Sequence, residues 1–382
     1  MQQQALRFVL MRGGTSKCLM FKENDLPPAG PERDRVLLAT FGSPDPRQID
    51  GLGGATSYTN KVCIIAPSAC EDADVDYTFG QVNVSLPMVD YGGNCGNCSS
   101  AVGPFAIDEG LVRVREGVTR VRILNTNTQK LIVAEVPTRH GHAVYEGDYE
   151  IAGVPGTGAR QRLWFYDPAG SMTSTLLPTS HVLDLFQVQE RSIAVSLVDA
   201  ANPVVFVKAS DIGLNGTEAA AEIDNRPEIL AVLEELRGKA AVRLGFVNEW
   251  QHAAAITPAV PKIAIVASAQ PYTDLYGRRV TEQQIDIVAR IMSMGRCHPA
   301  YALTGAIATG AAVAIPGTVV QRLVASTLTR QLAVRIGHPS GVMEVEIEAE
   351  YSGEIPRIVR ASASRTARRI ADGMLYIRCP LR

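Results

Sequence analysis

The sequence predicts an α+β protein with two domains, on three observations. At 382 residues the chain is longer than one ordinary domain, and each half is long enough to bury its own core. Strand-like runs occur in both halves. Each half also contains one very apolar segment that starts with small residues, at 93–107 and at 303–315. The two halves therefore share a weak repeat of architecture.

Composition argues against several classes of protein. The chain has 37 basic and 39 acidic residues, a net charge of -2 and 6% aromatic residues, unlike a nucleic-acid binder or a membrane-surface protein. The N-terminus lacks the charged and then apolar segments of a signal peptide, and no apolar window is long enough to span a membrane. We expect a cytoplasmic protein with no nucleic-acid or membrane partner.

The seven cysteines are an odd number scattered over the chain, which argues against a disulfide framework and for a reducing compartment. Cys95 and Cys98 form a C-x-x-C pair, but zinc needs further ligands. The other close pairs, His140 with His142 and Cys297 with His298, are not at finger-like spacing. We expect no metal site, and we expect Cys98 to be a core residue.

In the first half, residues 5–22 predict a strand, a glycine turn and a strand, with Thr15, Ser16 and Lys17 at the turn. A short helix follows at 32–41. A loop rich in glycine and hydroxyl groups then ends on Lys61 just as an apolar strand begins. A lysine at such a junction can lie beside a buried cleft.

Strands at 75–89 lead into a turn that carries Cys95 onto the first turn of a helix. The unpaired N–H groups and the positive dipole there favour ionisation of a thiol and can bind a carboxylate. Pro104 is expected to shorten or bend that helix. Residues 118–136 predict a hairpin.

Glycine, proline and threonine cluster at 150–180, where we place the domain crossing. In the second half, strands are predicted at 192–198 and 204–207, and a helix from 227 that stops at Gly238. A capping box at Thr281 predicts a further helix to Gly295. The last strand is expected at 374–377, and the basic residues 365–369 are expected to be solvated.

Six motifs in order along the chain resemble one family. They are MRGGTSK at 11–17, GGAT with KV at 53–62, GNCGN with AVGPFAI at 93–107, DPAGSM at 167–172, VDAANP at 198–203 and LTGA at 303–306. Together they resemble the PrpF-like isomerases, which include methylaconitate isomerase, methylitaconate delta-isomerase and 4-oxalomesaconate tautomerase on a diaminopimelate epimerase-type fold.

The resemblance implies two pseudo-symmetric domains, each a strongly curved, mostly antiparallel sheet wrapped around a central apolar helix. The substrate would lie between the N-termini of the two helices. The expected domains are 1–175, with the C-terminal strand at about 355–382 returning to it, and 176–354. We expect a homodimer.

The resemblance also implies catalytic roles for Lys61 and Cys95. Where the related epimerases have a second cysteine this chain has Thr304, which is too weak an acid or base for a two-thiol racemase. The implied reaction is a cofactor-independent allylic isomerisation of an unsaturated di- or tricarboxylic acid such as 4-oxalomesaconate or 2-methylaconitate. Either Lys61 is the base, once its pKa is lowered, and Cys95 handles the second proton, or Lys61 makes both transfers and Cys95 positions the substrate.

Substrate carboxylates are expected on backbone N–H groups at the two helix starts. The alternatives are an amino-acid or hydroxyproline-type epimerase and a non-catalytic carboxylate-binding protein. His298 is either a proton shuttle or a residue that caps its own backbone. The expected binding residues are Thr15, Ser16, Lys17, Asn94, Gly96, Asn97, Ser171, Asn202, Arg296, His298, Thr304, Gly305 and Ala306.

Overall fold

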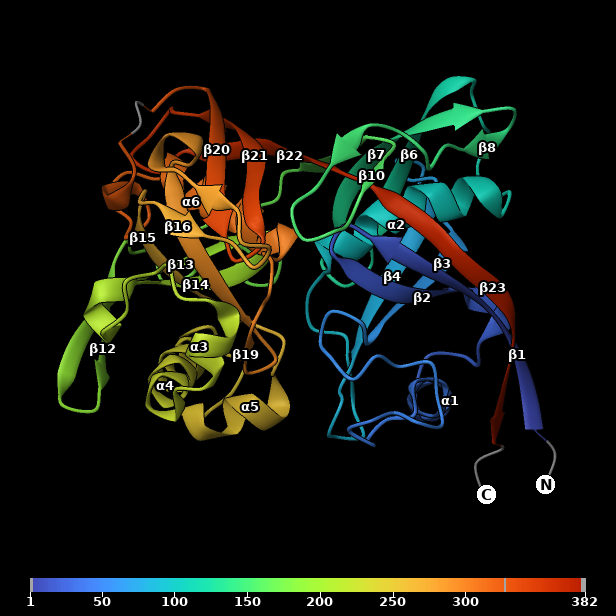
Figure 1. Cartoon of the computed structure of the whole chain (residues 1–382), viewed down its shortest axis with the longest axis horizontal. Coiled ribbons are helices and arrows are strands. Elements are labelled where there is room, and N and C mark those ends of the chain that lie inside the picture. Colours follow the sequence, from blue (N-terminus) through green and yellow to red (C-terminus); the bar gives the residue numbers. More distant parts are fainter. Residues whose placement is uncertain (1–2, 326–327, 379–382) are drawn as a thin grey trace. The chain divides into compact units, whose positions relative to one another are not determined.

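The computed structural model describes residues 3–325 and 328–378 and divides into two compact units (Figure 1). The first unit is Met1–Leu163 with Arg365–Arg382, and the second is Trp164–Ser364. The first crossing was expected within 150–180, with the first domain ending at 175, and the second at about 355. The units divide between Leu163 and Trp164, which lies within the expected range, and between Ser364 and Arg365. These points lie in the strands β11 (Gln161–Tyr166) and β22 (Arg357–Arg365).

The first unit follows the predicted order of elements. The hairpin at the N-terminus, the short helix, the strand that starts at Lys61 and the 118–136 hairpin are all confirmed. The elements are β1 (Gln3–Gly13), β2 (Ser16–Lys22), η1 (Glu23–Asp25), α1 (Pro31–Phe41), β3 (Lys61–Pro67), β4 (Val75–Val82), β5 (Val89–Asp90), α2 (Gly96–Asp108), β6 (Gly117–Asn125), β7 (Lys130–Arg139), β8 (His142–Ala143), β9 (Tyr149–Glu150), β10 (Thr157–Gly158) and β23 (Ala367–Arg378).

The sheet of the first unit has the order β23-β1-β2-β3-β4-β6-β7-β8. Neighbouring strands are antiparallel except β2 with β3 and β4 with β6, which are parallel. Parallel neighbours need a crossover connection. Here α1 lies in the first crossover and α2 in the second.

The second unit has more helices outside its sheet. Its elements are β12 (Asp184–Val188), β13 (Arg191–Ala200), β14 (Asn202–Lys208), η2 (Ala209–Ile212), α3 (Ala220–Asp224), α4 (Pro227–Arg243), η3 (Trp250–His252), α5 (Ala253–Ile256), β15 (Lys262–Ser268), β16 (Tyr272–Thr273), β17 (Arg279–Val280), η4 (Glu282–Gln284), β18 (Ile287–Ser293), β19 (Arg296–Cys297), α6 (Leu303–Ala314), η5 (Gln321–Leu323), β20 (Gln331–His338) and β21 (Gly341–Glu350), followed by β22.

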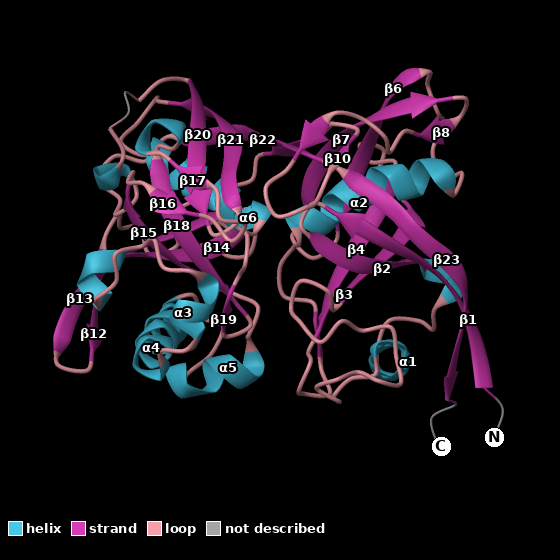
Figure 2. Ribbon diagram, in the orientation of Figure 1, coloured by secondary structure: helices cyan, strands magenta, loops and turns pink. Residues whose placement is uncertain are grey.

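The two sheets repeat one topology. The second runs β12-β13-β14-β15-β18-β20-β21-β22, and its parallel pairs are β14 with β15 and β18 with β20. The parallel pairs therefore occupy the same places as in the first sheet, and α6 lies in the same crossover as α2. Figure 2 shows strands predominating in both units. The predicted pseudo-symmetric α+β fold is confirmed.

Each sheet encloses one buried helix. Every residue of α6 is buried, as is every residue of α2 except its last, Asp108. Helix α2 continues through Pro104 to Asp108, so the expected shortening does not occur. The most apolar helix, α6, has only 12 residues. Within the described residues, no helix combines the length and the apolar character that crossing a membrane requires.

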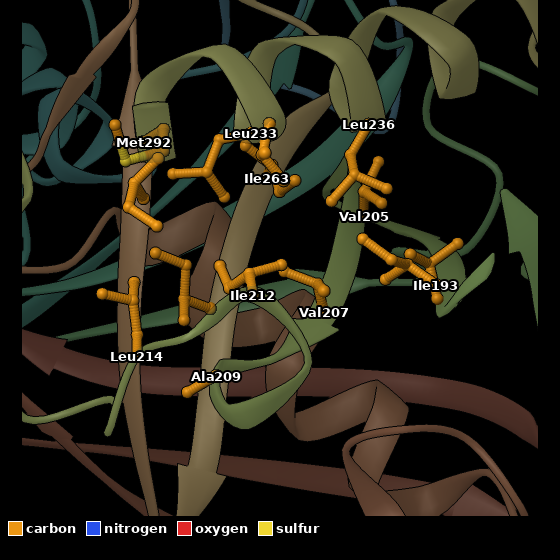
Figure 3. Close-up of a cluster of buried hydrophobic side chains, with 14 of the residues drawn as sticks. Ile193, Val205, Val207, Ala209, Ile212, Leu214, Leu233, Leu236, Ile263 and Met292 are labelled. Carbon is orange, nitrogen blue, oxygen red and sulfur yellow. The ribbon is translucent and has the colours of Figure 1, made fainter. Parts of the chain in front are cut away.

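The opposite face of each sheet is covered by other helices. In the first unit, Leu19, Val62 and Ile64 pack with side chains of α1. In the second, α4 covers the sheet, and Figure 3 shows Leu233 directed at the sheet beside Ile263 and Leu236 beside Val205. Strands in the middle of each sheet are therefore buried on both faces, which explains their continuous apolar runs.

Two predictions for the second unit were wrong. Helix α4 does not stop at Gly238 but runs to Arg243. A Cβ at Gly238 would lie 2.6 Å from the backbone oxygen of Trp250, so this glycine permits close packing and does not end the helix.

The capping box at Thr281 exists but opens only the single 3-10 turn η4. The next residues form β18, which is buried along its whole length. Its branched side chains, such as Ile287 and Val288, suit a central strand, and pairing on both sides outweighs the local helix signal.

The C-terminal strand is attached to the first unit by an ion network around Glu109, the residue that caps the end of α2. Its carboxylate accepts hydrogen bonds from Arg7 on β1 at 2.8 and 3.0 Å and from Arg369 on β23 at 3.0 Å, and pairs with Lys22 on β2 at 3.0 Å. Burial alone would raise the pKa of Glu109. The hydrogen bonds from the three cations lower it to about 2.

We expect Glu109→Gln to lower the free energy of unfolding at neutral pH by about 1–2 kcal/mol. The full pKa shift corresponds to about 3 kcal/mol, but Arg7 is 40% exposed and water screens its charge. Because the pKa is lower in the folded protein, the contribution is complete above the ordinary value of 4.5 and is lost as the pH falls towards 2. Urea unfolding at several pH values would measure this. A variant equally destabilised at every pH would contradict it.

Candidate active site

The face of the sheet opposite α1 carries the predicted lysine. The register pairs Lys61 on β3 with Cys18 on β2 and with Gln81 on β4, and it pairs Cys63 with Phe79. Residues directly opposite each other in a sheet point to the same face. Since the alternate residues Val62 and Ile64 pack with α1, these side chains face α2.

Lys61 is buried, with 6% of its surface exposed. Its Nζ donates a hydrogen bond to Oε1 of Gln81 at 2.7 Å and lies 5.1 Å from the centroid of the Phe79 ring. The amide nitrogen of Gln81 donates to the backbone oxygen of Asn60 at 2.8 Å, which fixes the amide so that its oxygen faces the lysine. Within the described chain, Lys61 makes no salt bridge. The amine is thus positioned by neutral groups.

Cys95 is the N-cap residue of α2 and is half-buried. Its Sγ accepts a hydrogen bond from the backbone N–H of Cys98 at 3.5 Å and lies 3.9 Å from Oγ of Ser16. Burial raises the pKa of the Cys95 thiol well above its ordinary value, although the charge of Lys61 and the N–H of Cys98 act in the other direction. Desolvation thus outweighs the one long N–H contact, which is opposite to the ionisation expected from the helix start.

The tip of the β1–β2 hairpin packs on the first turn of α2. Gly14 has a φ of +51°, and a Cβ there would lie 2.3 Å from Oδ1 of Asn97, so only glycine fits. Asn97 donates a hydrogen bond from Nδ2 to Oγ1 of Thr15 at 3.1 Å. Ser16 is buried, whereas Lys17 is half-buried. The predicted turn residues and the predicted helix start therefore lie together.

Arg365 is a candidate that the sequence analysis missed. It was assigned to a solvated basic segment, but it is buried, and its Nε donates to Oδ1 of Asn97 at 3.2 Å. Burial lowers the pKa of Arg365 to about 10. The signal that was available is the run of small residues at 361–364, which suits a strand that is buried on both faces. A guanidinium group thus lies beside the helix start where carboxylate binding is expected.

Two further predicted residues lie at the same helix start. Asn94 is buried, and its Oδ1 accepts a hydrogen bond from Ser99 Oγ at 3.4 Å. Gly96 and Asn97 are the first two residues of α2, where backbone N–H groups have no acceptor within the helix.

In the second unit, Asn202 and Thr304 are both buried, and Nδ2 of Asn202 donates to Oγ1 of Thr304 at 3.2 Å. Helix α6 begins at Leu303 with Ala302 as N-cap, so Thr304 lies inside the first turn and not before it. The N–H of Ala306 donates to the backbone oxygen of Ala302 at 2.8 Å. The N–H of Ala306 is therefore not free to bind a carboxylate. Gly305 comes before this first helical hydrogen bond of α6.

The remaining predicted residues of the second unit differ in burial. Ser171 is buried and donates a hydrogen bond to the buried carboxylate of Asp199, which also accepts the backbone N–H groups of residues 172 and 173 at 2.8 Å. His298 is buried, and its Nδ1 accepts the N–H of Ala300 at 3.0 Å, as in the capping alternative. Arg296 is exposed on β19. Asp199, whose carboxylate holds the 170–173 loop, was not among the predicted site residues.

Comparison with known proteins identifies relatives that span the whole chain. The family model described as "PrpF protein" matches residues 3–378. The chain is 46% identical to the 3-methylitaconate isomerase of Eubacterium barkeri, with 98% of each chain covered. It is 39% identical to the 2-methyl-aconitate isomerase of Shewanella oneidensis, with 97% and 96% covered, and 39% identical to the 4-oxalomesaconate tautomerase of Pseudomonas putida, with 99% and 97% covered.

Solved structures agree on the fold. A methylitaconate-delta-isomerase superposes with a TM-score of 0.78 at 44% identity, covering 99% of this chain and 96% of that one. A hydroxyproline epimerase from Agrobacterium vitis gives a TM-score of 0.58 at 12% identity, with 98% and 94% covered. The second likeness is one of fold alone.

We expect alkylation of Cys95 by iodoacetamide to remain slow at neutral pH and to keep accelerating above pH 9. The reason is that burial raises the pKa of this thiol, and the thiolate is the reactive form. Peptide mass spectrometry would measure the rate, with the exposed Cys70 of the same chain as internal control. A rate at Cys95 that reaches its plateau below pH 8 would contradict the burial argument.

Proposed function

The chain belongs to the PrpF family and is an enzyme of the isomerase class, and we propose that it moves a carbon–carbon double bond in an unsaturated di- or tricarboxylic acid. The named relatives act on 3-methylitaconate, 2-methylaconitate and 4-oxalomesaconate, and these acids are the candidate substrates. The observation that carries the proposal is a buried lysine, held only by neutral groups, in the same unit as a half-buried cysteine that caps a helix start.

Lys61 is the proposed base. Removing a proton from carbon requires a neutral amine directed at the substrate, and the contacts with Gln81 and Phe79 fix the direction of the Nζ atom. The proton leaves a carbon that is allylic to the double bond and moves to Nζ. The electron pair left behind is delocalised over the double bond and the adjacent carboxylate as a dienolate.

Cys95 is the proposed acid. Because burial keeps its proton on sulfur at neutral pH, it donates this proton to the other end of the allylic system, and the double bond is then in its new place. The resulting thiolate recovers a proton from the ammonium group of Lys61. One proton has left carbon and one has returned, so the cycle closes without a cofactor.

The negative charge that develops on the substrate needs stabilisation. The N–H groups of Gly96 and Asn97 and the positive end of the α2 dipole favour an anion at this position. Arg365, hydrogen-bonded to Asn97, adds a buried positive charge beside them. These groups are the proposed binding site for one substrate carboxylate.

An epimerase that uses two thiols is not supported. The N-cap of α6 is Ala302, where α2 has Cys95, and Thr304 carries a hydroxyl group. A hydroxyl is too weak an acid or base to exchange a proton on carbon. The second unit therefore offers no thiol at its helix start.

The proposal also includes the assembly and the location of the protein, which are a homodimer and the cytoplasm. All six cysteines of the described residues are free, which suits a reducing compartment. Size-exclusion chromatography with light scattering would measure the oligomeric state.

We expect the enzyme in deuterated water to introduce deuterium into at least one of 3-methylitaconate, 2-methylaconitate and 4-oxalomesaconate as it isomerises that acid. Lys61→Ala should lower this rate by about 10³-fold, because a general base contributes about 10²–10⁴-fold. Proton NMR measures both isomerisation and exchange.

The matched control is Lys262→Ala, which changes the lysine at the start of β15, the topological counterpart of β3. Its rate should equal that of the unchanged enzyme. Deuterium uptake only at the α-carbon of proline or hydroxyproline would refute the proposed reaction, and full activity of Lys61→Ala would reject Lys61 as the base.

Gln81→Glu tests how Lys61 is positioned. A carboxylate at the place of the amide would stabilise the protonated lysine, so kcat at pH 7 should fall about tenfold or more and recover as the pH rises. Gln81→Met, which removes the hydrogen bond without adding charge, should lower kcat without that recovery. Identical pH–rate profiles for the two variants would count against a direct effect on Lys61.

A further inference from the structure

Three cysteine sulfurs meet in the core of the first unit. Cys18 lies on β2, Cys63 on β3 and Cys98 on α2, and all three are 0% exposed. Their Sγ atoms lie within 4.8 Å of one another. The C-x-x-C pair of the sequence therefore does not act as a pair, because Cys98 groups with two cysteines that are distant in the chain.

The surroundings of this cluster are also rich in sulfur. The thioether of Met20, which is fully buried, lies 3.6 Å from Sγ of Cys18. The hydroxyl of Tyr77 lies 3.9 Å from Sγ of Cys63. Soft ligands of this kind select soft cations, such as Cu(I), over magnesium or calcium.

The spacing suits a single ion. With metal–sulfur bonds of about 2.3 Å, three sulfurs around one ion in a plane lie about 4.0 Å apart. The observed limit of 4.8 Å leaves each sulfur only a small movement from that arrangement. No backbone rearrangement is required to bring the three ligands onto one ion.

The three thiols must lose their protons to bind an ion, so metal binding would release protons and would strengthen as the pH rises.

The competing explanation is that three small buried residues merely fill the core, which is a common role of free cysteine. Cys297 illustrates that role, since it is buried without another cysteine and burial raises its pKa to about 12. The cluster differs because three separate elements each direct a sulfur at one point, next to a fourth sulfur.

We propose that Cys18, Cys63 and Cys98 form a buried binding site for one thiophilic cation, Cu(I) in preference to Zn(II). Cu(I) accepts three sulfur ligands, whereas structural zinc is almost always tetrahedral and needs a fourth strong ligand. Met20 supplies only a weak fourth ligand. The proposed isomerase chemistry uses none of the three thiols, although the backbone N–H of Cys98 contacts Cys95 and Cys18 is paired with Lys61.

The test is a competition titration of the full-length, reduced protein with Cu(I) held by the chromophoric chelator bicinchoninate. The protein should withdraw one equivalent of Cu(I) per chain. Cys18→Ala, Cys63→Ala and Cys98→Ala should each weaken binding by at least about 100-fold. Cys297→Ala, the matched control for a buried thiol, and Cys70→Ala, the control for an exposed thiol, should leave binding unchanged.

Circular dichroism and thermal unfolding show whether each variant is folded. X-ray absorption of the copper-loaded unchanged protein gives the ligands directly and needs no variant. Three sulfur neighbours support the site. Nitrogen or oxygen neighbours, binding well below one equivalent, or loss of binding in Cys70→Ala would overturn it, and an equivalent of Zn(II) that Cu(I) does not displace would overturn the choice of cation.

Discussion

Enclosure of α2 by its own sheet is the constraint on which the first unit depends. A buried helix start brings polar groups into the core, where each must find a partner. The glycine tip of the β1–β2 hairpin approaches closely enough to meet Asn97, and Thr15 and Arg365 bind the two ends of its side-chain amide. The helix start, the first hairpin and the returning C-terminal segment are therefore one packed assembly.

The same enclosure determines the chemistry of the two nearby cysteines. Cys95 is half-buried at the N-cap, and desolvation keeps its thiol protonated, which suits an acid in proton transfer to carbon. Cys98, one turn further along, is directed into the core, where it meets Cys18 and Cys63. One turn of helix thus separates a thiol suited to proton transfer from a thiol suited to a soft cation.

The repeated topology shows which parts of the fold are architectural and which belong to one unit. Both units place a buried helix in the second parallel crossover. In both, the strand that follows the first crossover begins with a lysine. Lys61 is nearly fully buried beside Gln81, whereas Lys262 is only partly buried and donates to the backbone of Ala259. The N-cap is a cysteine in one unit and an alanine in the other.

Local patterns in the sequence were sufficient for much of the secondary structure, whereas the wrapped-sheet fold and the catalytic roles of Lys61 and Cys95 were implied by the resemblance to a family. Glycine turns, alternating strands and the small-residue starts of α2 and α6 depend on neighbouring residues, so the hairpins, both buried helices and the places of Lys61 and Cys95 could be predicted. Tertiary structure decided the rest. Pairing on both sides made β18 a strand despite its capping box, and packing against Trp250 carried α4 through Gly238. Burial of Arg365, the protonated state of Cys95 and the meeting of Cys18, Cys63 and Cys98 depend on desolvation and on contacts between residues distant in the chain, which no local pattern encodes.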